Sequence, residues 1–318
     1  TIFSTLNDRG LPLEDSDIFK AELYKKYEDR DIFIEKWKDF SQICNTGLIS
    51  LDDIFRYYMH FIRAKHKDKS KEIALRKFYF RNYILNDNKN YILTTDVNNI
   101  LTTDVNLLDE LIDLAKIWSY INSNYNSEKP EYLTISYETK QFLHCLKNYP
   151  NDFWKYALSV FILKNKKNAN FDHDLLKMIK KLTAFLFIKF IQKPSVNSIK
   201  DDIYNSCISI YEKNELNFDI KFDENAIKES ISNFSLSRFS KSLILLKAYL
   251  NPEQNELIPN NFEIEHILPK KWQTANYNGW SQKDAQNFIE KFGNKIALEK
   301  KINIQAGNGY FSRKKENT

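Results

Sequence analysis

The sequence predicts a mainly α-helical protein, in which a long helical region is followed by a small α+β domain at the C-terminal end. Two observations predict this fold class. Up to about residue 250, apolar residues recur three and four positions apart, which places them on one face of a helix. Four of the six glycines lie in the last fifth of the chain, so the turn chemistry changes there. We therefore expect a domain boundary near residue 251.

The composition predicts a soluble, cytoplasmic protein of more than one domain. A length of 318 residues suits two domains, and 42% hydrophobic residues indicate a globular chain. The longest nearly apolar stretch, residues 182–191, contains Lys189 and is too short to span a bilayer. Cys44, Cys145 and Cys207 lie far apart and form no Cys-x-x-Cys pair, so we expect reduced thiols.

The helical region is divided by predicted caps and breaks. Asp15 or Ser16 can cap the first helix, and Pro150, Pro194 and Pro252 lie where we expect breaks between helices. The stretches with helical periodicity are residues 15–27, 54–63, 107–121, 153–163, 174–192, 198–211 and 239–250.

One heptapeptide occurs twice. Residues 92–98 and 100–106 both read Ile-Leu-Thr-Thr-Asp-Val-Asn, and the pair is too short and too isolated for a solenoid. We interpret it as a local duplication in a loop or at the start of a helix.

The last part of the chain predicts strands and helices in alternation. Its pattern favours a linker over residues 252–259, a strand over 262–267, a helix from the cap Ser281 to about 292, a strand over 295–298 and a helix from about 301. Two strands and a terminal helix, with a helix inserted between the strands, form a compact arrangement suited to binding a metal.

The positive charge is concentrated in this region. The net charge of the chain is +5, and residues 261–318 hold ten Lys/Arg against six Asp/Glu, which is +4. A local positive excess favours a polyanionic partner such as a nucleic acid, although solvated lysines are the common alternative.

The same region carries side chains suited to phosphodiester hydrolysis. His266 is a candidate general base, because an imidazole titrates near neutral pH and can accept a proton from water. Ile267 and Leu268 would bury one side of it. Asn294, which follows the turn residue Gly293, could hold the imidazole or restrain the loop that faces the substrate.

The candidate metal ligands are Glu265 and Asn303, whose side-chain oxygens suit magnesium. Adjacent residues on a regular strand point to opposite faces, so Glu265 and His266 share a site only if the strand ends or bulges there. Pro269 favours an early end. Arg313, Lys314 and Lys315 are candidate phosphate contacts. We interpret the other histidines as structural, namely His60, His66, His144 and His173.

These residues resemble a known family. Residues 264–269 and 292–294, then Asn303, Asn308 and residues 311–314, are similar to the HNH-type, or His-Me finger, nuclease domain of GmrSD-like type IV restriction enzymes. The resemblance covers about residues 235–318. It implies a ββα-metal fold over residues 251–318, with His266 as general base, Glu265 and Asn303 as ligands of Mg²⁺ or Mn²⁺, and Asn294 in the catalytic loop. Lys295 departs from the pattern, since an apolar residue commonly follows Gly-Asn.

The start of the chain carries a second resemblance. Residues 2–13 and 17–20 are similar to the close of the ParB-like nucleotidase domain of the same enzymes, so residues 1–20 would be its tail and residues 21–250 a helical connecting domain. The chain begins without Met and lacks the Asp-Gly-Gln-Gln-Arg type motif of that domain. We therefore expect a fragment that uses an NTP only through a missing N-terminal domain.

The resemblance implies a modification-dependent DNA endonuclease that acts in anti-phage defence. Its substrate would be double-stranded, modified phage DNA, with no membrane partner. Which modification and nucleotide it uses, and whether two chains pair, stay open. Two alternatives also stay open: a nucleic-acid-binding or interaction module without catalytic activity, and a nuclease that acts on RNA.

Overall fold

The computed structural model describes residues 13–70, 73–85, 91–95, 98–104, 106–195, 197–216, 218, 221–233, 238–272 and 281–306. The chain divides into two compact units, which we treat separately. The first unit contains Thr1–Thr134, Lys155–Phe171 and Asp201–Asn217, and the second contains Ile135–Trp154, Asp172–Lys200 and Phe218–Thr318. The domain limits drawn from the sequence at residues 20 and 250 divide the chain differently and stay predictions.

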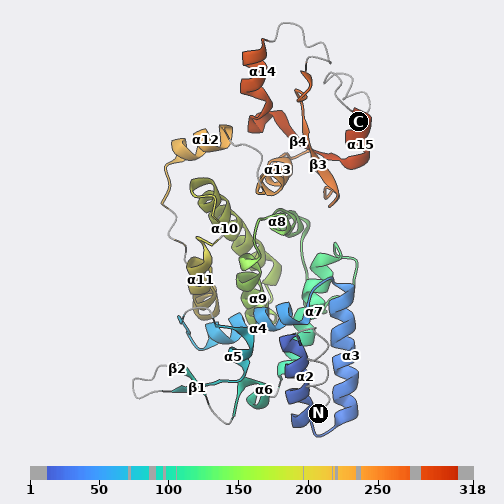
Figure 1. The fold of residues 1–318 in the computed structure, drawn as a ribbon, viewed down its shortest axis with the longest axis vertical. Coiled ribbons are helices and arrows are strands. Elements are labelled where there is room, and N and C mark those ends of the chain that lie inside the picture. The colour runs from blue at the N-terminus through green and yellow to red at the C-terminus, as the bar shows by residue number, and fades with distance from the viewer. Residues whose placement is uncertain are drawn as a thin grey trace. The chain divides into compact units, whose positions relative to one another are not determined.

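The first unit is helical with one two-stranded hairpin (Figure 1). Strands β1 (Asn82–Leu85) and β2 (Tyr91–Thr94) pair antiparallel. Its helices are α2 (Asp15–Lys26), α3 (Arg30–Thr46), α4 (Leu51–Lys65), α5 (Leu75–Tyr79), α6 (Ile100–Thr103), α7 (Leu107–Asn122), most of α9 (Phe153–Asn165) and nearly all of α11 (Lys200–Lys213).

The second unit combines helices with the other strand pair. Strands β3 (Phe262–His266) and β4 (Lys295–Glu299) are antiparallel, and the 3₁₀ helix η2 (Phe292–Asn294) leads into β4. The helices are α8 (Tyr137–Lys147), most of α10 (Phe171–Gln192), α12 (Glu224–Ser232), α13 (Ser240–Tyr249), α14 (Gln282–Ile289) and α15 (Lys300–Ala306). Among the described helices, none is long and apolar enough to cross a membrane.

The mainly helical fold class is confirmed, and each stretch with helical periodicity lies in a helix or overlaps one with ends shifted by a few residues. The two C-terminal strands are also confirmed, at 262–266 and 295–299. The predicted helix from Ser281 to about 292 ends earlier, at Ile289, and Ser281 caps it by accepting a hydrogen bond from the Asp284 N–H at 3.2 Å.

The structure adds elements that were not predicted from the sequence: α3, α5, α8, α12, η2 and the β1–β2 hairpin. The sequence of α3 does indicate a helix, because its apolar residues recur three and four positions apart. These residues, Phe33, Trp37, Phe40 and Cys44, are all buried. Asp29 caps this helix through the N–H groups of Asp31 and Ile32, at 3.0 Å each.

Helices α3 and α7 pack closely at Gly47, which ends α3. A Cβ atom built on Gly47 would lie 2.7 Å from the Cα atom of Ser119 in α7, closer than real Cβ contacts. The Asn122 amide nitrogen also donates to the carbonyl oxygen of Gly47 at 2.9 Å. The absence of a side chain at residue 47 therefore allows the two helices to approach.

We expect Gly47→Ala to lower the free energy of unfolding of the first unit by about 1–3 kcal/mol, because the added methyl group pushes against backbone. The thermal unfolding midpoint measures the change. Gly293→Ala is the matched control, since a Cβ there meets no atom within 4 Å. Equal midpoints for Gly47→Ala and wild type would contradict the close approach.

Candidate active site

The β3–β4 pair is regular as far as the candidate base. Its register places Glu265 opposite Ile296 and His266 opposite Lys295, which begins β4. Directly opposite residues in an antiparallel pair have side chains on the same face, whereas consecutive residues alternate. His266 therefore shares its face with Lys295, and Glu265 leaves the opposite face. The strand is regular through His266 and shows no bulge, so Glu265 and His266 point to opposite faces and the expected sharing of one face by the two side chains is wrong.

Asn294 ties the segment after β3 to the end of α14. Its Oδ1 accepts the backbone N–H of Leu268 at 2.7 Å, and its Nδ2 donates to the carbonyl oxygens of Leu268 and Ile289, both at 3.0 Å. The backbone carbonyl of Asn294 accepts from the Ile267 N–H at 2.9 Å. Three of these contacts hold the residues directly after His266 and the fourth reaches the end of α14; the catalytic role of Asn294 stays a prediction.

His266 lies in a small cluster of charged groups. It is 8% exposed, and its Nε2 lies 3.8 Å from Oε1 of Glu290, which also lies 3.8 Å from Nζ of Lys270. The buried Lys295 ammonium lies 3.2 Å from the other carboxylate oxygen of Glu290 and also donates to the Glu290 backbone carbonyl.

These surroundings lower the pKa of His266 below its ordinary value of 6.5. Burial is the largest cause and lowers the pKa, whereas the negative charge of Glu290 opposes it and Lys270 and Lys295 lower the pKa further. The imidazole is therefore neutral at neutral pH and can accept a proton.

The pKa of Glu290 is also lowered. Burial by itself raises it, but the hydrogen bond and charge of Lys295, with the charges of His266 and Lys270, outweigh burial. Neither Glu290 nor Lys270 was predicted from the sequence, in which Lys295 stands out only as a departure from the family pattern. No motif marks Glu290, because its position beside His266 depends on how α14 ends.

The two candidate metal ligands lie on the other face of β3. Asn303 projects from α15, and its Nδ2 donates to Oε2 of Glu263 at 2.8 Å. Glu263 and Glu265 are two residues apart on a regular strand, so both side chains leave the face that α15 covers. The structure therefore adds Glu263 to the predicted pair of Glu265 and Asn303.

The donor chemistry on this face fits a hard divalent cation. Two carboxylates and an amide oxygen are ligands of the kind that magnesium takes. Across the described ranges, no three side chains of His, Cys, Asp or Glu gather into a metal-binding group. The metal roles of Glu265 and Asn303 stay predictions, as do the phosphate contacts at Arg313, Lys314 and Lys315, which lie outside the described residues.

Helix α13 packs against strand β4 and is hydrogen-bonded to both strands of the pair (Figure 1). Lys241 donates to the carbonyl oxygen of Phe262 at the start of β3, and Lys247 donates to that of Lys295 at the start of β4, both at 3.2 Å. Ser242 donates to the carbonyl oxygen of Cys145 in α8 at 2.6 Å. The strand pair is thus fixed to α13, and α13 to α8.

His144 in α8 is a buried part of this support. Its Nδ1 is hydrogen-bonded to the hydroxyl of Tyr249 at 2.6 Å, and the same hydroxyl oxygen accepts the N–H of Ile258 at 3.1 Å. The imidazole also makes an edge contact with Phe262, at 6.3 Å between ring centroids. Burial, with a smaller effect of Lys147, lowers the pKa of His144 to about 4.

This shift predicts an acid-sensitive fold. Above pH 6.5 His144 is neutral in both states, but as the pH falls from 6.5 to about 4 only the unfolded chain binds the proton. We expect His144 to remove about 2–3 kcal/mol of stability over this window. The free energy of unfolding against pH measures it, and His144→Gln should flatten the curve. His173→Gln, at an exposed histidine, should leave it unchanged, and equal slopes in all three proteins would contradict the assignment.

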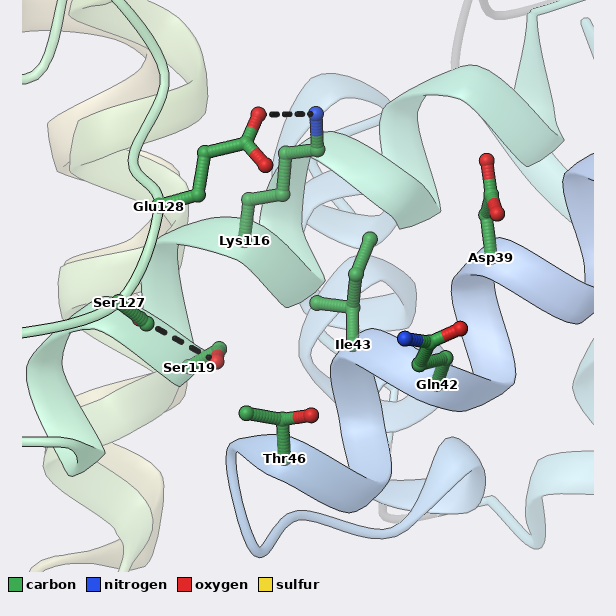
Figure 2. A pocket seen from close by; sticks show the side chains of 8 residues that line it. All are labelled: Asp39, Gln42, Ile43, Thr46, Lys116, Ser119, Ser127 and Glu128. Atoms are coloured by element: carbon green, nitrogen blue, oxygen red, sulfur yellow. Dashed lines mark hydrogen bonds and ion pairs between the residues drawn. The ribbon is translucent and has the colours of Figure 1, made fainter.

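A polar pocket of about 310 Å³ lies in the first unit (Figure 2). Two of its lining residues, Lys116 and Glu128, form an ion pair at 3.2 Å, and the hydroxyls of Ser119 and Ser127 lie 3.4 Å apart. None of the predicted site residues lines it. The lining residues are Asp39, Gln42, Ile43, Thr46, Lys116, Ser119, Ser127 and Glu128.

The fold and the site together define a small α+β region with a buried histidine at the end of β3 and an oxygen-rich cluster on the opposite face of that strand. Residues 200–318 match the model of a family described as GmrSD restriction endonucleases, C-terminal domain. The match supports the C-terminal part of a GmrSD-family restriction endonuclease, and it begins earlier than the 235–318 expected from the sequence. Comparisons with curated proteins and with solved structures gave no match.

Proposed function

We propose that this chain is the C-terminal part of a GmrSD-like type IV restriction enzyme, and that it cleaves DNA with a His-Me finger site that depends on a divalent metal. The observation that supports this most is the neutral, buried His266 at the end of β3, followed by a loop that Asn294 holds, within the segment that matches the family. A restriction endonuclease acts on DNA, so the substrate class follows from the same match.

In the proposed reaction His266 takes a proton from a water molecule as the water oxygen bonds to phosphorus. The bond from phosphorus to the leaving oxygen breaks, and that oxygen carries away the electron pair. Asn294 keeps the loop after β3 in place, so His266 presents the same ring orientation in each turnover. A general base at this step accounts for a rate factor of about 10²–10⁴.

Glu265 and Asn303 would hold Mg²⁺ or Mn²⁺, with Glu263 orienting Asn303 through its hydrogen bond. These ligands leave the face of β3 opposite to His266, so a shared phosphate would have to reach both sides past the end of the strand. A bound divalent cation stabilises negative charge on the phosphate and on the leaving oxygen. Arg313, Lys314 and Lys315 would contact backbone phosphates, because lysine and arginine supply most such contacts. The excess positive charge of residues 261–318 agrees with this assignment.

The intact enzyme would carry a ParB-like nucleotidase domain before residue 20 and would use an NTP through that domain. It would act in the cytoplasm on modified, double-stranded phage DNA. The helical region over residues 21–250 would connect the nucleotidase and the nuclease.

Metal dependence separates this proposal from its alternatives. With the intact enzyme we expect cleavage of double-stranded DNA in Mg²⁺ or Mn²⁺, no cleavage in a chelator, and recovery when the metal is restored. DNA binding without cleavage under every metal condition would indicate a binding module. Faster cleavage of RNA than of DNA, measured side by side, would indicate an RNA nuclease. Either result would contradict the proposal.

A further inference from the structure

Another cavity of the first unit, of about 360 Å³, shares no lining residue with the pocket of Figure 2. It lies between α4, strand β1 and the end of α6. Helix α4 contributes four residues at helical spacing, which therefore share one face. They are Tyr58, Phe61, Ile62 and Lys65. A cavity of this volume with aromatic walls is typical of a site for a small organic ligand.

The aromatic walls are fixed by their own contacts. The rings of Tyr58 and Phe61 lie 5.7 Å apart between centroids. On the β1 side, the Tyr83 ring stacks on the imidazole of His66 at 4.3 Å, and its hydroxyl donates to Asp68 at 2.7 Å. A planar ligand therefore meets rings that are already in place, so its binding orders few side chains.

One carboxylate in the cavity is fixed as a hydrogen-bond acceptor. Asp104 accepts the Tyr58 hydroxyl on one carboxylate oxygen at 3.1 Å and the backbone N–H of Asn106 on the other at 3.2 Å. The Asp104 backbone carbonyl also accepts from the Lys26 ammonium at 3.0 Å. Each carboxylate oxygen has more than one lone pair, so it can accept a further N–H from a ligand.

Two other lining residues add a donor and a positive charge. Asn82 accepts the N–H of Tyr83 on its side-chain oxygen at 2.9 Å, so its amide nitrogen is the group that can donate to a ligand. Lys65 is exposed, so its ammonium can meet a phosphate at the solvent. An acceptor for an amino group, a donor for a ring nitrogen and a cation for a phosphate together match a nucleotide with an amino-bearing base.

We propose that this cavity binds a nucleotide of cytosine or adenine. The base lies against Tyr58 and Phe61. Its amino group donates to Asp104, its ring nitrogen accepts from Asn82, and its phosphate contacts Lys65. The nucleotide is either free or part of an unpaired nucleic-acid strand, because both present the same base, amino group and phosphate. This inference concerns the first unit and does not rest on DNA cleavage by the second.

Calorimetric titration of the 318-residue chain with CMP and UMP tests the base selectivity. Uracil carries a carbonyl oxygen where cytosine carries its amino group, so it presents a second acceptor to Asp104. We expect CMP to bind about 5–150-fold more tightly than UMP. AMP should bind like CMP, and ribose 5-phosphate, which lacks a base, should not bind. Equal affinities for CMP and UMP, or no binding of CMP and AMP, overturn the proposal.

Asp104→Asn separates recognition of the base from a structural role. The amide keeps an oxygen for the Tyr58 hydroxyl but adds an NH₂ group, which donates to the uracil carbonyl. We expect the preference for CMP over UMP to fall at least about fivefold. Asp109→Asn removes the same charge from an exposed residue outside the cavity and should keep the preference. An unchanged preference in folded Asp104→Asn overturns the proposal.

Thr103→Phe keeps the test decisive if Asp104→Asn unfolds. Thr103 is an exposed residue of α6 that lines the cavity, so a larger side chain there occupies the space of the base and removes none of the proposed polar contacts. We expect CMP affinity to fall by about tenfold or more. Wild-type affinity in this variant overturns the placement of the ligand.

Competition distinguishes the two sources of the nucleotide. Single strands of cytosine and of thymine deoxynucleotides, equal in length, are added to the chain with CMP bound. Displacement by the cytosine strand alone identifies an unpaired base of a nucleic acid, whereas CMP binding that neither strand affects identifies a free nucleotide, and both support the proposal. Equal displacement by both strands means that phosphate alone is recognised and overturns it. These measurements stay decisive if the protein proves not to be a nuclease.

Discussion

Replacing His266 by alanine is expected to reduce DNA cleavage by about 10²–10⁴-fold, the usual contribution of a general base. The physical reason is local, because burial keeps this imidazole neutral and the contacts of Asn294 hold the loop that follows it. Initial rates of plasmid nicking by the intact enzyme measure the effect.

Binding of DNA by His266→Ala should stay close to wild type, because phosphate contacts supply most of the affinity and His266 is largely buried. His173→Ala, at an exposed histidine on α10, is the matched control and should cleave normally. Cleavage by His266→Ala at the wild-type rate would remove the central assignment of the site.

Replacing Asn294 by alanine is expected to lower the free energy of unfolding of the second unit by about 3–4 kcal/mol. The change removes one accepted and two donated hydrogen bonds and leaves the N–H and carbonyl of Leu268 and the carbonyl of Ile289 without this partner. Leu268 is 6% exposed, so water replaces these bonds poorly. Urea denaturation measures the loss of stability, and so does hydrogen exchange of the backbone amides of β3 and β4.

Cleavage by folded Asn294→Ala should also fall, because the loop after His266 loses its restraint. Asn287→Ala, on the exposed face of α14, is the control and should change stability by less than about 0.5 kcal/mol. If the two alanine variants proved equally stable, Asn294 could not be the tie between the loop and α14.

The repeated heptapeptide shows where local sequence is not sufficient. Ile-Leu-Thr begins both copies, yet these three residues lie in strand β2 in the first copy and begin helix α6 in the second. In the first copy Ile92 pairs with Ile84 across the hairpin. In the second, Asn99 forms a capping box with Thr102, in which each side chain bonds the backbone of the other. The expectation of a helix start holds only for the second copy, because a strand needs a distant partner.

The candidate site shows the same division between local and distant information. The motif residues His266 and Asn294 could be selected from the sequence because their spacing and type match a known pattern. The partner of Asn303 could not be selected, since Glu263 and Glu265 have equal claims until the register of β3 and the position of α15 are known. Glu290 is an ordinary exposed glutamate in the sequence, and only the end of α14 places it beside His266.

The sequence by itself determined the mainly helical class, both C-terminal strands and the candidate base, because hydrophobic period and motif spacing are local properties of the chain. The tertiary structure alone decided which face each carboxylate occupies and which charges surround His266. Strand register, the burial of Lys295 and the end of α14 depend on contacts between residues far apart in the chain. Which distant residues come together is specified by packing between segments, and no single segment carries a sequence signature of that packing.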